Sequence, residues 1–381
     1  LEFRRVLFRS ATGRFFFLLL LFLLCIGTSA NSSSVVGTGA GKALVRVWLS
    51  SINPAGATVS GDALQSLTSS GWKSVQGGSL KPAVTPGTDI QLRSGKGALL
   101  RIDSNNKVFY TPGVLRIVNV GGQSLCIVEL PIEDYVSRVL ASEMPARFPA
   151  EALKAQSVAI RSYVLPNHLK HRSQLSDVCD TSCCQNYSKE RVLPESITKA
   201  CQETRGVILR YQGRPFTALY SSSCGGTPSP FSLLARTENG PSSCPYCSVA
   251  PCHSWRLSLT QDELLKVLSI TGSSYISAIK VLTRDTSGRL DKVRIDHENG
   301  TLEITGKEIR KLLGTSRLRS LLVTFEASEN TGEILISGKG FGHGTGMCQW
   351  GASGMALPPP NNKTFRDILS FYYPGVEIGV L

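Results

Sequence analysis

The sequence predicts an α+β protein in which helices pack on antiparallel sheets around a groove. Short apolar runs of alternating polarity recur between turn residues, and amphipathic segments that begin with helix-start residues lie among them. The 36 Gly and 19 Pro provide many turns. With 381 residues, 41% of them hydrophobic, the chain is long enough for one large or two ordinary domains.

The N-terminal segment has the pattern of a secretory signal. Residues 1–10 differ in character from the rest and are left out of the fold prediction. An apolar run from Phe15 to Ile26 then follows a single Arg and precedes small residues up to Ala30. Because this run is too short to span a bilayer, we expect cleavage after Ala30 and no other membrane contact; a buried core helix is the alternative. Residues 31–43, rich in Ser and Gly, are predicted to be a flexible linker.

The net charge of the chain is +13, and removing residues 1–30 takes away four Arg and one Glu and leaves +10. For an exported protein, periplasmic or cell-envelope or extracellular, this charge favours wall polymers, glycan-linked carboxylates or lipid head groups over nucleic acid. A merely soluble basic surface is the alternative.

Residues 44–114 are predicted to form a β-rich N-terminal region, and residues 115–381 a second domain. We expect strands at 97–103, 107–112, 114–120 and 124–130, with turns between them. Helices are expected at 131–144 and 149–165, each with Pro first and acidic residues in its first turn. Further helices are expected at 195–206, 259–270, 305–314 and 364–375, a hairpin at 207–226, and strands at 275–285, 290–305, 320–328 and 333–340.

Glu143 is the candidate acid. It falls in the last turn of its helix, where the helix dipole disfavours a negative charge, beside Met144 and Pro145, which would desolvate it. Both effects raise a carboxylic pKa, as a general acid for glycoside cleavage requires. Hydrolysis normally uses two carboxyls, and we find no second one, since Glu133, Asp134 and Glu151 are explained as helix-start residues. A single acid suffices when the sugar's own hydroxyl attacks. A plain surface Glu is the alternative.

Two stretches are rich in Cys and His. The first holds His168, His171, Cys179, Cys183 and Cys184, and the second holds Cys244, Cys247, Cys252 and His253. Four soft ligands at close spacing suit a structural zinc ion, and disulfides in an exported chain are the alternative at both places. Adjacent Cys183 and Cys184 are difficult to fit into one compact site, so one of them could be free or bridged elsewhere.

The glycine-rich stretch at 337–356 is the third candidate. It lacks the phosphate-loop pattern, because no G-x-x-x-x-G-K-[ST] occurs, and His343 takes the place of the third glycine of G-x-G-x-x-G. We expect no helix directly after its alternating glycines at 338–346. A tight loop that brings His343, Thr345 and Gln349 to a cleft beside Glu143, for hydrogen bonding to sugar, is predicted. A packed turn with a structural His is the alternative.

Several of these stretches together resemble the sporulation protein D / amidase-enhancer family of bacterial wall proteins. The matching stretches are "IEDYVSRVLASEMPARFPAEALKAQSVAIRSYVL", "CDTSCCQNY", "ETRGVIL", "ALYSSSCGG", "GKGFGHGTGMCQWGASGMA" and "ILSFYYPG", in family order over about residues 115–381. The resemblance implies a lytic transglycosylase that cleaves peptidoglycan glycan strands, preferably ones stripped of stem peptides, with Glu143 as general acid/base. It also implies Lys154 and Arg161 as groove residues, and it adds Tyr220 and Ser222 to the substrate-binding set with His343 and Gln349.

The resemblance bears on the metal prediction as well. Some family members carry zinc at "CDTTHCQ", where this chain has Cys183 in place of the usual His. The candidate ligand set is therefore His171, Cys179, Cys183 and Cys184, for a structural zinc ion that the chemistry itself does not require.

Two functions remain open at this point. One is the transglycosylase, and the other is a non-catalytic wall-binding protein that stimulates an N-acetylmuramoyl-L-alanine amidase. A zinc amidase is less well supported, because it needs an open coordination position and the cysteine clusters look closed.

Overall fold

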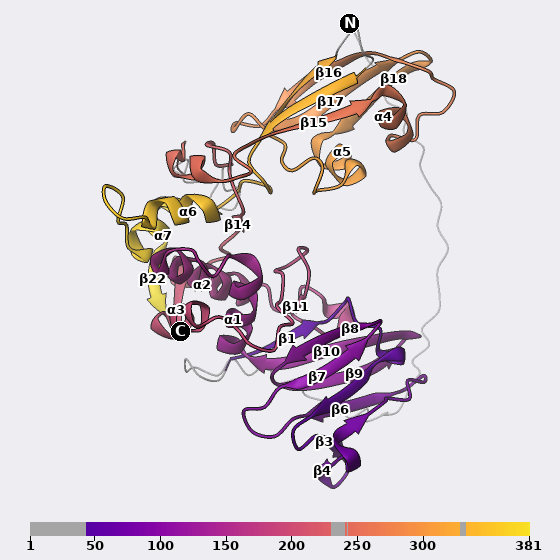
Figure 1. Cartoon of the computed structure of the whole chain (residues 1–381), viewed down its shortest axis with the longest axis vertical. Helices are drawn as coiled ribbons and strands as arrows, with labels where there is room; N and C mark the ends of the chain where they lie inside the picture. The colour runs from indigo at the N-terminus through magenta and orange to yellow at the C-terminus, as the bar shows by residue number, and fades with distance from the viewer. Residues whose placement is uncertain (1–42, 230–240, 242, 328–332) are drawn as a thin grey trace, which may run out of the picture. The chain divides into compact units, whose positions relative to one another are not determined.

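The computed structural model describes residues 43–229, 241, 243–327 and 333–381. This part of the chain contains helices α1 to α7 and strands β1 to β22. The strands form several sheets, and the combination of helices and sheets confirms the predicted α+β class (Figure 1). The predicted signal segment and nearly all of the predicted linker lie outside the described residues. Among the helices that are described, none has the length and apolarity of a membrane span.

Two sheets form the β-rich N-terminal region. Paired in order, the first contains β11 (Val178–Cys179), β1 (Leu44–Trp48), β10 (Gln123–Pro131), β9 (Val114–Val120), β6 (Asp89–Arg93), β3 (Gln65–Thr68) and β4 (Gly71–Ser74). The second contains β5 (Ser79–Leu80), β2 (Thr58–Gly61), β7 (Leu100–Ser104) and β8 (Lys107–Thr111). The predicted strands at 97–130 correspond to β7 to β10 and are confirmed. Side chains alternate along β1, so that Val45 and Val47 are buried while Arg46 is partly exposed.

Five helices pack together beside this region. They are α1 (Ile132–Glu143), α2 (Ala150–Val164), α3 (Glu195–Glu203), α6 (Gln349–Ala356) and α7 (Phe365–Tyr372). Helix α2 contacts α1, α3, α6 and α7, so the C-terminal helices lie beside a helix from the first half of the chain (Figure 1). Ala152, Ala155 and Ala159 are fully buried on α2 and let its neighbours approach closely. One continuous core joins these helices to the N-terminal sheets.

A second core lies between residues 254 and 339. It is enclosed by β15 (Ser254–Thr260), β19 (Val323–Ala327) and β20 (Glu333–Lys339) in one sheet and by β16 (Ile276–Arg284), β17 (Leu290–His297) and β18 (Gly300–Thr305) in another, with helices α4 (Gln261–Val267) and α5 (Gly306–Leu313). The side chains of Thr260 and Thr305 cap α4 and α5. The predicted domain boundaries did not separate this core from the rest of residues 115–381.

Two small sheets complete the fold. Strand β12 (Val207–Tyr211) turns at Gln212 and Gly213 into β13 (Arg214–Pro215), as predicted, and also pairs with the C-terminal β22 (Glu377–Val380). The other is a parallel pair of two-residue strands, β14 (Tyr220–Ser221) and β21 (Met347–Cys348).

The expectation of no helix directly after the glycine-rich loop is wrong, because α6 begins at Gln349, immediately after β21. Its Gly351 and Gly354 disfavour a helix intrinsically. A Cβ atom on either would come within 2.1 Å of Tyr372 Oη or of the Tyr246 carbonyl, so close packing explains both the glycines and the helix.

Candidate functional site

Glu143 is the last residue of α1, and the next residue, Met144, is extended and buried. The backbone N–H of Asn186 donates to Glu143 Oε1 over 2.7 Å, and the Asn186 side-chain amide donates to the same oxygen over 2.9 Å. Desolvation raises the pKa of Glu143, while the Asn186 donors and the nearby Gln349 amide oppose part of that rise. The carboxyl is therefore fixed in position, and its protonated form is favoured relative to an exposed Glu.

A chain of buried hydrogen bonds lies beside this carboxyl. Tyr135 Oη donates to Gln185 Oε1, and Gln185 Nε2 donates to Tyr220 Oη, each over 2.8 Å. Burial and the charge of Glu143 raise the pKa of Tyr220 well above its ordinary value. Tyr220 thus stays a neutral hydroxyl that is oriented by Gln185 next to the acid.

The glycine-rich loop reaches this place through the pairing of β14 with β21, which sets Tyr220 opposite Met347. Gly346 has φ of 72°, and a Cβ atom there would come within 1.9 Å of the Leu219 carbonyl oxygen, so glycine is needed for the close approach. The Nδ1 atom of His343 accepts a hydrogen bond from the Thr345 N–H over 3.0 Å. Local desolvation lowers the pKa of His343, although the residue itself remains exposed.

Gln349 is the first residue of α6 and is 5% exposed. Its Nε2 atom has no hydrogen-bond partner among the described residues, although the amide lies near enough to Glu143 to affect its pKa. A buried, unsatisfied donor is costly unless a ligand or water completes it. The structure thus places the Gln349 amide near the acid.

Ser222 lies differently from the residues around it. Its carbonyl accepts the Trp350 N–H over 3.1 Å, and its side chain interacts with Cys252. None of its described contacts involves Glu143. We therefore leave Ser222 out of the proposed sugar-binding set.

Lys154 and Arg161 are held by acidic residues of the helices. Arg161 is 0% exposed; its Nη2 and Nε atoms donate to both oxygens of Glu133 over 2.7 and 3.0 Å, and its Nη1 donates to the Val207 carbonyl. Lys154 pairs with Glu151 and Glu203 at 2.7 and 2.6 Å. These contacts argue against the expected role in glycan binding, most strongly for the fully enclosed Arg161.

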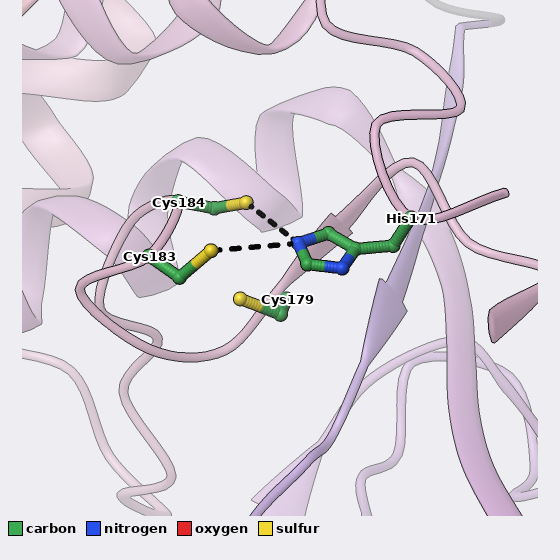
Figure 2. Close-up of side chains that lie close together, drawn as sticks. All are labelled: His171, Cys179, Cys183 and Cys184. Carbon is green, nitrogen blue, oxygen red and sulfur yellow. Dashed lines mark hydrogen bonds between the residues drawn. The ribbon is translucent and has the colours of Figure 1, made fainter. Parts of the chain in front are cut away.

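The first cysteine cluster comprises His171, Cys179, Cys183 and Cys184 (Figure 2). His171 Nε2 lies 3.2 Å from Cys184 Sγ and 3.8 Å from Cys183 Sγ, and one nitrogen or sulfur atom from each of the four residues lies within 4.8 Å of the others. The expected difficulty with adjacent Cys183 and Cys184 is wrong, because the turn after β11 directs both sulfurs inward. His168 is not among the four.

The second cysteine cluster differs from the predicted one. Its members are Cys224, Cys244, Cys247 and Cys348, again within 4.8 Å of one another. Cys252 and His253, which the sequence grouped with Cys244, are not members, and His253 Nδ1 lies 3.6 Å from Cys247 Sγ as a neighbour. All ten cysteines in the described part of the chain are free thiols. Both clusters contain residues that could hold a metal ion.

Sequence reasoning missed Asn186 and Gln185. Both lie in "CDTSCCQNY", directly after the first cluster, and nothing in their residue types distinguishes them from ordinary polar loop residues. Only the fold shows that this turn faces the end of α1.

Two family profiles match the chain. The stage II sporulation protein profile matches residues 121–211, which contain Glu143, the first cluster and Asn186. A domain of unknown function, DUF8618, matches residues 248–346, which contain the second core.

Curated relatives extend this likeness. An uncharacterized protein of Brachyspira hyodysenteriae is 36% identical over 70% of this chain and 71% of its own length. The stage II sporulation protein D of Bacillus amyloliquefaciens is 32% identical over 66% of this chain and 75% of its own length. The amidase enhancer of Bacillus subtilis is 28% identical over 63% of this chain but only 39% of its own length.

Fold, site and relatives together define a protein of cell-wall remodelling. The chain belongs to the stage II sporulation protein D family.

Proposed function

We propose that the protein is an exported lytic transglycosylase that cleaves peptidoglycan glycan strands, preferably peptide-stripped ones, with Glu143 as general acid/base. The observation that carries the proposal is the desolvated carboxyl of Glu143, fixed through one oxygen by Asn186 and lying beside the buried amide of Gln349. A raised pKa favours the protonated carboxyl, which a general acid requires.

The reaction balances with one carboxyl. Protonated Glu143 donates its proton to the glycosidic oxygen as the bond from that oxygen to the sugar C1 breaks. The C6 hydroxyl of the same sugar then forms the new bond to C1 and gives its proton to the Glu143 carboxylate. The product ends in 1,6-anhydro-muramic acid, no water is consumed, and the acid is regenerated.

The neighbourhood of the acid supports this route over hydrolysis. The pKa of Glu143 responds to desolvation, to Asn186 and to Gln349, and no second carboxyl of the described residues is among its perturbing groups. A hydrolase would normally place a second carboxyl within about 5–9.5 Å. Tyr220, His343 and Gln349 are the proposed hydrogen-bonding contacts for the sugar.

The first cysteine cluster is proposed to hold a structural zinc ion. Three thiolates and one imidazole fill a tetrahedral zinc site and leave no position open for substrate. Cys184 precedes Gln185 and Asn186 directly, so an ion here would hold the turn that positions both residues against Glu143. Its proposed task is positioning, and all proton transfers are assigned to Glu143.

Export is part of the proposal. It rests on the apolar run at residues 15–26 with the small residues that follow, and on the wall-related family to which the chain belongs. The net charge of +10 that remains without residues 1–30 suits an acidic wall polymer as the partner.

A second candidate function is stimulation of a cell-wall amidase without catalysis. The match to the amidase enhancer of Bacillus subtilis favours it. The two functions share the same substrate surface and differ in whether Glu143 takes part in bond cleavage.

The deciding experiment is mass spectrometry of glycan fragments after incubation of peptide-free glycan strands with the wild type, Glu143→Gln and Glu303→Gln. Glu303 is an exposed carboxyl on β18 and serves as the matched control. We expect 1,6-anhydro products from the wild type and the control, and a loss of about 10²-fold or more in Glu143→Gln. Reducing-end products would show hydrolysis, and no products with glycan binding intact would favour the amidase-stimulating role.

A further inference from the structure

The buried second cysteine cluster has no role in the function proposed above. We propose that Cys224, Cys244, Cys247 and Cys348 together bind one zinc ion, which forms a second, closed metal centre and joins the glycine-rich loop to the rest of the site.

The spacing of the sulfurs fits a metal ion better than disulfides. The Sγ atoms of Cys224 and Cys247 are 3.6 Å apart, and all four lie within 4.8 Å of one another. Zn–S bonds of about 2.3 Å in a tetrahedron place the sulfurs about 3.8 Å apart, whereas a disulfide bond is about 2.05 Å long. Four mutually adjacent sulfurs are the arrangement that a single ion of this kind requires.

Burial distinguishes this cluster from an ordinary group of core cysteines. All four residues are 0% exposed. In an exported chain, four adjacent thiols would be prone to oxidation, and one shared ion gives every sulfur a partner. Four thiolates also complete the tetrahedral shell, so the ion would be structural rather than catalytic.

The surroundings donate hydrogen bonds to the sulfurs, as metal-bound thiolates require. The N–H groups of Cys224 and Gly351 each donate to Cys348 Sγ over 3.3 Å. Cys348 is also the N-cap of α6, a position where Ser, Thr, Asp or Asn is usual and a sulfur acceptor is strongest as a thiolate. Tyr372 Oη lies 3.1 Å from Cys244 Sγ.

A buried cation lies beside the cluster. Arg289 is 4% exposed and donates to the carbonyl oxygens of Cys224 and Thr227 over 2.9 and 2.8 Å. A zinc ion with four thiolates carries a net charge of −2, so a neighbouring guanidinium stabilises it in the core. Asp285 accepts the Arg289 backbone N–H over 2.9 Å and also acts on the guanidinium by its charge, but no salt bridge joins the two side chains within the described residues. Thiolates at Cys224 and Cys348 would add to this counter-charge.

The connectivity indicates what the ion would do. Cys224 follows β14, Cys244 and Cys247 flank the start of the 3-10 helix η5 (Pro245–Val249), and Cys348 ends β21. The β14–β21 ladder has only two residues in each strand, which is too short to be stable by itself. One ion would tie these segments together and so fix Gln349, the residue after Cys348, beside Glu143.

The test counts metal in the purified full chain. Elemental analysis is expected to give two zinc ions per wild-type chain and one in a variant that lacks the first cluster, Cys179→Ser with Cys183→Ser. Because this variant changes none of the four cysteines of the second cluster, it tests that cluster without removing a ligand from it. The control Cys126→Ser with Cys201→Ser changes two buried cysteines outside both clusters and is expected to keep two ions.

A second measurement identifies the ligands. The first-cluster variant, reloaded with Co²⁺, is expected to show the absorption of a tetrahedral four-thiolate site, and its four thiols should resist alkylation until the chain unfolds. A folded variant without metal, a mass that shows two disulfides, or a coloured iron protein as isolated would each overturn the assignment.

The effect on activity rests on the proposed function, whereas the metal count does not. Two zinc ions per chain without glycan cleavage would contradict the proposed transglycosylase activity and still support the second metal centre. Glycan cleavage by a chain that binds only one zinc ion would support the transglycosylase activity and contradict the second metal centre.

Discussion

The two cysteine clusters differ in how they are built. Three residues of the first lie within six positions of one another, and its Cys183 is exposed. The second collects its cysteines from three separate segments and buries all of them. A local cluster of this kind orders one turn, whereas a dispersed one holds together parts of the chain that are distant in sequence. Each is followed by a residue at the acid: Asn186 lies two residues after Cys184, and Gln349 directly follows Cys348.

The largest expected effect is on stability, and it tests this difference directly. Cys244→Ser with Cys247→Ser should lower the thermal unfolding midpoint by more than 10 °C or prevent folding, because structural zinc contributes about 10–16 kcal/mol in small domains and total stabilities are about 5–15 kcal/mol. Cys179→Ser with Cys183→Ser should lower it by only a few degrees, since the first cluster orders one local turn and does not join distant segments. Circular dichroism melting curves measure both unfolding midpoints. Equal shifts in the two variants would contradict the proposed difference between the clusters.

A smaller effect concerns the pH dependence of cleavage. The Asn186 donors and the Gln349 amide both lower the pKa of Glu143, with Asn186 contributing more. Removing either side chain should raise that pKa, so the descending, alkaline limb of the pH–rate profile moves to higher pH, and moves further in Asn186→Ala than in Gln349→Ala. Initial rates on glycan strands across the pH range give both limbs. A downward shift in either variant would contradict the assignment of Glu143 as the acid.

The smallest expected effect is on the pH dependence of stability, and it distinguishes a catalytic role of Glu143 from a structural one. Burial raises the folded pKa of Glu143 above its ordinary value of 4.5, so the stability that its protonated form provides is lost as the pH rises through the folded pKa. Glu143→Gln should therefore match the wild type near pH 4.5 and melt about 1–2 °C higher at pH 7. Differential scanning calorimetry at both pH values checks this, and a lower midpoint at pH 7 would assign Glu143 a structural role.

Whether the sequence could predict a part of the site depended on how far apart its residues lie along the chain. The sequence brings Cys179, Cys183 and Cys184 together because they are neighbours, and it predicts the end of α1 because Pro145 follows it. Cys224 and Cys348 could not be joined, since 124 residues separate them and only the β14–β21 pairing brings them together.

Arg161 shows the same limit in a different form. The family resemblance implied Arg161 as a groove residue, while Glu133 was explained by its position at a helix start. The fold pairs the two, and breaking one partner of such a buried pair typically costs about 3–5 kcal/mol. Helix α6 was missed for a related reason, because packing against Tyr372 and Tyr246 outweighs the low propensity of its glycines.

The β14–β21 pairing also determines the order in which the parts of the site can assemble during synthesis. A chain emerges from the ribosome N-terminus first, so the turn with His171 and Asn186 can fold against α1 while more than a third of the protein is still to be made. Gln349 can join Glu143 only after residue 348 of 381 has been synthesised. The site is therefore assembled last, and a truncated or half-made chain would present the acid without the loop that completes it.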